Sequence, residues 1–155
     1  MSSRAWKKGR GRLGVLDPLL GTWVAEQDSP KGPVRCTRTF RRILAGKYVQ
    51  LSALWEFEDG EYEEVALYGV GPERRLCFWS FTSDGKQSQG TIADVSDVHP
   101  EAIGFEAQMP GGLARMAYWP GEEGEDGDET IHWVVESRTK QGWNRFTHHH
   151  YRRSD

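Results

Sequence analysis

Apolar and polar residues alternate along most of the chain, and short turn-forming pairs interrupt this alternation. A period of two residues is typical of β-strands that bury one face. Four pairs, Asp59-Gly60, Asp84-Gly85, Gly111-Gly112 and Gln141-Gly142, suit tight hairpins. The pattern predicts strands at residues 21–27, 34–42, 47–58, 62–71, 76–83, 86–94, 102–109, 113–120, 130–140 and 143–153. The exception is Leu13 to Leu20, where Asp17-Pro18 can begin one short helical turn.

These strands predict an all-β fold. Without helices to cross over the sheet, neighbouring strands must be antiparallel. Roughly ten sequential strands joined by short loops would leave costly edges unless the sheet closes, so we expect a closed up-and-down antiparallel barrel. The 155 residues fit one domain at residues 13–155. Residues 1–12 are basic and rich in glycine, and we interpret them as a flexible tail.

The hairpins predict which side chains face the interior, because residues opposite each other in a hairpin share a face. A turn at Gln141-Gly142 would set His148 opposite Val135 and His150 opposite Trp133. The same reasoning at Asp59-Gly60 and Gly111-Gly112 leads to an apolar and aromatic interior. Leu54, Val65 and Leu67 then fall on the outer face, which suggests a homodimer contact.

A barrel of about ten strands is wider than side chains alone need to fill, so we expect an internal cavity. Aromatic walls with a few polar anchors are typical of small-molecule sites. The predicted ligand-binding residues are Trp55, Phe57, Phe105, Trp133 and Phe146 in the walls, and His148, His150, Tyr68 and Tyr118 as polar groups. Arg38 joins them if a turn at Ala45-Gly46 sets it opposite Ala53, and it would then hold an anion such as a carboxylate.

Composition narrows the function further. A net charge of −3, from 20 basic and 23 acidic residues, argues against a nucleic-acid partner. No apolar run is long enough to span a membrane, and two cysteines make no disulfide framework, so we expect a cytoplasmic protein. No metal site is expected, because Val135 and Trp133 opposite the histidines cannot ligate. The common catalytic motifs are absent, and we favour binding over catalysis.

The segment Leu16-Asp-Pro-Leu-Leu-Gly-Thr-Trp23 resembles the opening of the calycin superfamily, which includes lipocalins and fatty-acid-binding proteins. It also resembles nitrobindin-like barrels and an uncharacterised bacterial family of lipocalin-like domains, whose later pattern resembles Ile43-Leu-Ala-Gly-Lys-Tyr48. The resemblance implies that Arg152, or else Arg153, covers Trp23 as a structural pair. It implies a hydrophobic or amphipathic ligand.

Two alternatives stay open beside simple ligand binding, for which no cofactor is needed. Nitrobindin-like barrels hold haem through a histidine of the final strand, and aligning Phe146 to Arg153 with that strand puts Phe146 in the ligand's place and His148 two positions on. The first alternative is therefore a haem protein that uses His148. The second is a small barrel enzyme that uses an inward-facing histidine.

Overall fold

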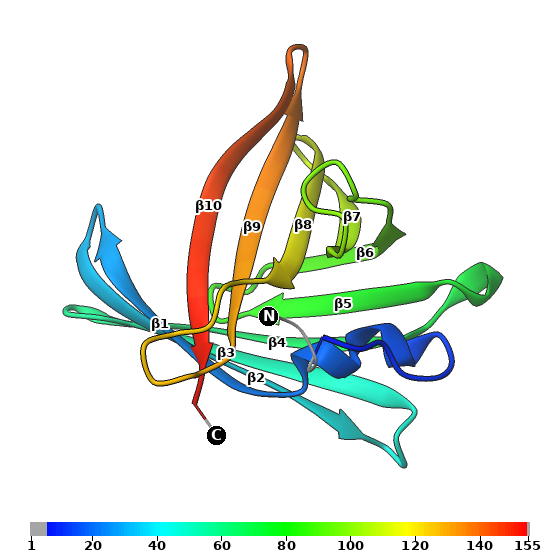
Figure 1. Ribbon diagram of the computed structural model, residues 1–155. Coiled ribbons are helices and arrows are strands. Elements are labelled where there is room, and N and C mark those ends of the chain that lie inside the picture. The colour runs from blue at the N-terminus through cyan, green and yellow to red at the C-terminus, as the bar shows by residue number, and fades with distance from the viewer. Residues whose placement is uncertain (1–5, 155) are drawn as a thin grey trace.

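The structure, a computed structural model, describes residues 6–154 and confirms the closed antiparallel barrel. Its ten strands follow one another around the wall, and β1 meets β10 to close it (Figure 1). The elements are η1 (Leu13–Leu19), β1 (Gly21–Ser29), β2 (Gly32–Ile43), β3 (Tyr48–Phe57), β4 (Gly60–Val70), η2 (Pro72–Arg74), β5 (Leu76–Thr82), β6 (Gln87–Ala93), β7 (Ile103–Met109), β8 (Gly112–Pro120), β9 (Thr130–Thr139) and β10 (Gly142–Arg153).

The two ends of the barrel differ. The up-and-down order gathers the hairpins β1–β2, β3–β4, β5–β6, β7–β8 and β9–β10 at one end, which we call the mouth. At the opposite end, the 3₁₀ helix η1 buries Leu16 and Leu19 completely. The indole Nε1 of Trp23 donates to the carbonyl of Leu19 at 2.8 Å, which fixes the helix to the first strand. Any cavity must therefore open toward the mouth or through the wall.

Glycines at the mouth begin strands instead of occupying turns. Three glycines, Gly60, Gly112 and Gly142, pair with Phe57, Met109 and Thr139 respectively. Gly112 and Gly142 have φ angles of 126° and 121°, which favour glycine, and Gly60 has a φ of 155°, close to extended backbone. Each hairpin turn thus lies one residue earlier than predicted, which moves opposite residues by two positions. Because side chains alternate with a period of two, a shift of two leaves the predicted faces of β3–β4 and β7–β8 unchanged.

The β9–β10 hairpin departs from the prediction because β10 contains a β-bulge. Arg145 pairs with Glu136, but Thr147, not Phe146, pairs with Val135. One extra residue reverses the faces of everything beyond it. Side chains at 147, 149 and 151 therefore point inward, and the expected interior positions of His148 and His150 are wrong: both side chains are exposed on the outer face.

The bulge also changes the basic residue at the closed end. Arg153, the residue paired with Trp23, places its guanidinium 4.3 Å from the indole ring centroid. It also donates through Nη1 to the carbonyl of Leu20 and through Nε to Glu129, both at 2.8 Å. Arg152 was the preferred partner in the sequence, but it lies outside and contacts Glu26 at 3.4 Å. The pairing is corrected to Trp23 with Arg153.

Three further expectations concern the surface. Residues 1–5 of the expected tail lie outside the described residues, whereas the indole of Trp6 donates to the carbonyl of Glu101 at 3.1 Å. Leu54 and Leu67 are half-buried on the outer face, and Val65 is exposed; the homodimer stays a prediction. Among residues 6–154, no helix has the length and apolar character needed to cross a bilayer.

Candidate functional site: a cavity beside a buried arginine

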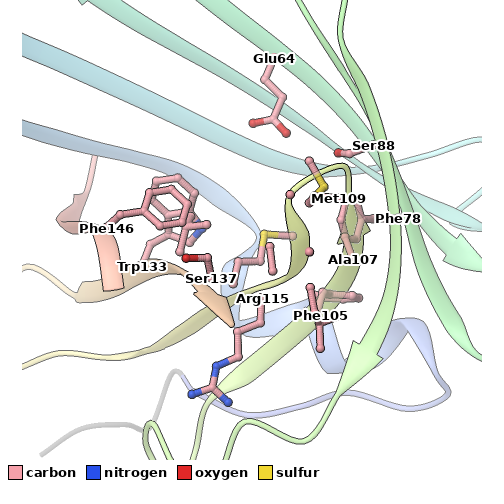
Figure 2. A pocket seen from close by; sticks show the side chains of 16 residues that line it. Glu64, Phe78, Ser88, Phe105, Ala107, Met109, Arg115, Trp133, Ser137 and Phe146 are labelled. Atoms are coloured by element: carbon pink, nitrogen blue, oxygen red, sulfur yellow. The ribbon is translucent and has the colours of Figure 1, made fainter. Parts of the chain in front are cut away.

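An apolar cavity of about 430 Å³ lies inside the barrel on the side of β7, β8 and β9 (Figure 2). Phe78, Phe105 and Trp133 form aromatic parts of its wall, and Met109 and Met116 add flexible side chains. The polar residues Glu64, Ser88, Arg115 and Ser137 also line it. Phe146, the bulge residue, borders the cavity but is 60% exposed. The space is apolar with few polar groups, as is usual for a site that holds a small molecule.

Arg38 lies in the interior and is only 1% exposed. It does not line the cavity itself, but Glu64 and Trp133, which approach its guanidinium, do. The β2–β3 register sets it opposite Ala53, which confirms the register expected from the Ala45-Gly46 turn. Ala53 in turn lies opposite Glu64 on β4. Because alanine is small, the two charged side chains can approach above it, and Arg38 Nη2 lies 3.8 Å from Glu64 Oε1.

The polar contacts of Arg38 extend across the barrel. Its Nε donates to the hydroxyl oxygen of Tyr118 on β8 at 3.0 Å. Glu64 accepts a short hydrogen bond of 2.5 Å from the hydroxyl of Ser80 on β5. We call Arg38, Glu64, Ser80 and Tyr118 the interior polar cluster. Since 3.8 Å is too long for a hydrogen bond, Glu64 balances the charge of Arg38 without occupying its donors.

Aromatic rings surround the guanidinium of Arg38. Its central carbon lies 4.1 Å from the ring centroid of Trp133, 5.6 Å from Trp55 and 6.0 Å from Tyr151. Burial by itself would lower the pKa of Arg38, but the surrounding tyrosines and Glu64 raise it above its ordinary value. The interior therefore holds a permanent cation stabilised by ring faces.

Three buried side-chain polar atoms in the described residues lack a hydrogen-bond partner: Arg38 Nη1, Tyr68 Oη and Trp133 Nε1. The Tyr68 hydroxyl also interacts with that of Tyr118, and the Arg38 guanidinium interacts with the Tyr151 hydroxyl. A buried donor without an acceptor costs roughly 1–3 kcal/mol. Buried polar groups in native proteins are normally hydrogen-bonded, and a polar group of a ligand can act as the partner.

The tyrosine, cysteine and histidine side chains around Arg38 are electrically neutral near pH 7. Burial raises the pKa values of Tyr68, Tyr118 and Tyr151, and it raises that of the Cys36 thiol to about 11. Burial, followed by the charge of Arg38, lowers the pKa of His149 to about 4. The interior thus offers one fixed cation, one carboxylate and several neutral hydrogen-bonding groups.

The remaining histidines of β9 and β10 form a separate group on the outer face. His132 Nδ1 and His148 Nε2 lie 3.0 Å apart, so one donates to the other. His150 stacks on His132 with ring centroids 4.4 Å apart. His148 therefore cannot ligate a haem inside the barrel, and neither His148 nor His150 can orient an internal ligand. Within residues 6–154, no three His, Cys, Asp or Glu side chains are placed to hold a metal ion.

Most other predicted site residues do lie in the interior. Phe105 and Trp133 are buried and line the cavity. Tyr68 and Tyr118 are buried, and Trp55 and Phe57 are half-buried, but none of these four lines it. Ser80, His149 and Tyr151 were not among the ligand-binding residues predicted from the sequence. The alternation of β5 could have indicated Ser80, since Phe78 two positions earlier faces inward. His149 and Tyr151 could not be placed without knowledge of the bulge.

No protein-family model matches the chain, and no curated protein matches it. The class that the structure defines is a closed antiparallel barrel of ten strands, compatible with the calycin-like fold. The fold by itself does not explain why the barrel buries the cationic side chain of Arg38 next to an apolar cavity.

Proposed function

We propose that this barrel binds an amphipathic small molecule, with an anionic end at Arg38 and an apolar body in the cavity. The observation that supports this proposal is the pair of buried N–H donors, Arg38 Nη1 and Trp133 Nε1, that have no acceptor. They belong to neighbouring side chains, since the guanidinium lies 4.1 Å from the Trp133 ring centroid. A ligand oxygen between them would satisfy both.

A carboxylate suits this position better than a neutral oxygen. Hydrogen bonds from a guanidinium to an ionised acceptor are about twice as strong as neutral ones. Glu64 lies 3.8 Å from Arg38 Nη2 and receives its own hydrogen bond from Ser80, so it leaves Nη1 available. The low polarity of the ring-lined interior strengthens the attraction between Arg38 and an incoming anion.

The apolar body of the ligand would lie among Phe78, Phe105 and Met116 in the cavity. A volume of about 430 Å³ is within the usual range for small-molecule sites. Each Å² of apolar surface removed from water contributes about 25 cal/mol, so a medium-length alkyl chain supplies most of the affinity. The anionic end then determines orientation.

Isothermal titration calorimetry with decanoic acid and decan-1-ol tests the proposal. We expect the wild-type protein to bind the acid at least about tenfold more tightly than the alcohol, because one charge-assisted bond contributes roughly 1.5–3 kcal/mol. Arg38→Met should abolish this preference and retain binding of the alcohol. Arg35→Met is the matched control, because Arg35 lies on the same strand but contacts Glu26 outside. Equal affinity of the wild-type protein for acid and alcohol contradicts the proposal.

A further inference from the structure

The wall of the barrel is interrupted between β6 and β7. Only three residue pairs join these strands, from Thr91↔Glu106 to Ala93↔Gly104. Yet β6 begins at Gln87 and β7 continues to Met109. Toward the mouth, residues 87–89 and 107–109 have no ladder partner across this seam, and we call this gap in the pairing the split. Gly90, at its inner end, is also unpaired with β7 but still packs against the carbonyl of Glu106. By contrast, the β7–β8 ladder continues to Met109↔Gly112 at the mouth.

The cavity reaches the outer surface at the split. A groove of about 630 Å³ lies outside the barrel over β5, β6 and β7, with Trp79, Gln89 and Gln108 among its walls. Ser88, Ala107 and Leu113 line both this outer groove and the inner cavity. These shared residues come from β6, β7 and β8, so the cavity and the groove are adjacent at the mouth ends of these three strands.

A second interrupted seam borders the cavity on one side only. Between β1 and β10, only Trp23↔Arg153 and Val24↔Arg152 are paired. Phe146 of β10 lines the cavity, but within the described chain no residue of β1 does. The seam between β6 and β7 has cavity-lining residues on both sides, among them Ser88 of β6 and Ala107 of β7.

We infer that the split is the lateral entrance through which a ligand passes between solvent and the cavity. This inference rests on the proposed function. Widening the split breaks no ladder hydrogen bonds between β6 and β7, because none of its residues are paired across the seam. Elsewhere along the cavity, the β8–β9 ladder remains paired from Ala114↔Ser137 to Pro120↔Ile131, so separating those strands would break its hydrogen bonds. Strand separation is therefore easiest where the cavity meets the groove.

Covalent closure of the split tests the inference. Continuing the β6–β7 register places Gln89 opposite Gln108, and both line the outer groove. The variant Gln89→Cys/Gln108→Cys is joined with a short bismaleimide linker and examined by stopped-flow fluorescence with dansyl-labelled undecanoic acid. Glu56→Cys/Glu61→Cys, joined in the same way, is the matched control, because these exposed residues pair near the mouth of the intact β3–β4 ladder.

We expect the linker across the split to slow association and dissociation of the probe together, each by about tenfold or more, with Kd changed less than about threefold. The control linker should leave both rates unchanged. Unchanged rates with the split closed, while the wild-type protein binds the probe, refute the entrance and leave the proposed function intact. A change confined to Kd also refutes it, because closure then only distorts the cavity. A wild-type protein that does not bind the probe overturns both.

Discussion

Replacing the buried ion pair by the neutral pair of Arg38→Met/Glu64→Gln should leave the free protein at least as stable as the wild type. At 3.8 Å and an effective dielectric constant of 20, the Arg38–Glu64 attraction is worth about 4 kcal/mol. Against it stand several kcal/mol of lost hydration for each ion and roughly 1–3 kcal/mol for the unpaired Nη1 donor. We expect the double variant to gain between about 0 and 3 kcal/mol in its free energy of unfolding.

The single variant Arg38→Met should behave differently, because it leaves Glu64 without its counter-ion. Removing one partner of a buried pair usually costs about 3–5 kcal/mol. The Glu64 side chain is 18% exposed, lines the cavity and keeps its bond from Ser80, so we expect a smaller loss, about 1–3 kcal/mol. From most to least stable, the order should therefore be the double variant, the wild type and the single variant.

Urea unfolding at pH 7, followed by tryptophan fluorescence and far-ultraviolet circular dichroism, measures these differences. The assay is performed without ligand, because a bound ligand would stabilise the wild type selectively. Arg35→Met serves as the surface control. A double variant that is less stable than the wild type by more than about 1 kcal/mol would refute the reasoning. The interior polar cluster would then have a structural role in stabilising the fold, and its buried charges would no longer point to a ligand-binding role.

Three further predictions concern other parts of the barrel. Arg153→Ala should lower the free energy of unfolding by about 2 kcal/mol in urea titrations, because it removes a ring contact and two partly buried hydrogen bonds, whereas Arg152→Ala should change it by less than about 0.5 kcal/mol. The pKa of His149 falls from 6.5 to about 4 on folding, so the unfolded chain binds more protons between these values and stability decreases as pH falls through them. His149→Gln should therefore lose less stability than the wild type between pH 7 and pH 4.5, by up to about 3 kcal/mol; equal losses would contradict this. Gly90→Ala should lower the thermal midpoint because its Cβ would meet a backbone carbonyl of β7, whereas Gly111→Ala, which has open space, should not.

The alternation of side chains was sufficient to predict much of the interior. Alternation indicates only on which face of the sheet a side chain lies, and an error of two residues in the register leaves that face unchanged. This is why the misplaced turns at Asp59-Gly60 and Gly111-Gly112 still assigned Phe105 and Tyr68 to the inner face. The inward position of Arg38 depended on a turn at Ala45-Gly46, and the pairing with Ala53 that such a turn implies is the one observed.

A single extra residue, by contrast, reverses the face of every side chain that follows it in the strand. The bulge at Phe146 adds one residue to β10, and no glycine or proline in the segment Arg145-Phe-Thr-His148 marks it. A regular strand would have placed His148 and His150 inside. The wrong placement therefore concerned His148 and His150, the most conspicuous candidate site residues, and no residue near the bulge indicated it.

The same bulge connects this irregularity to the candidate site. By reversing the face of the last residues of β10, it brings Tyr151 within 6.0 Å of the guanidinium of Arg38 and places His149 at 3.2 Å from the Tyr151 hydroxyl. A regular β10 would instead direct histidines from 148 and 150 toward the buried cation. The inserted residue thus supplies the aromatic face that surrounds Arg38, and it keeps the exposed histidines on the outside. Bulges commonly redirect side chains next to functional sites, and the position of this one agrees with a ligand site centred on Arg38 instead of on the histidine run.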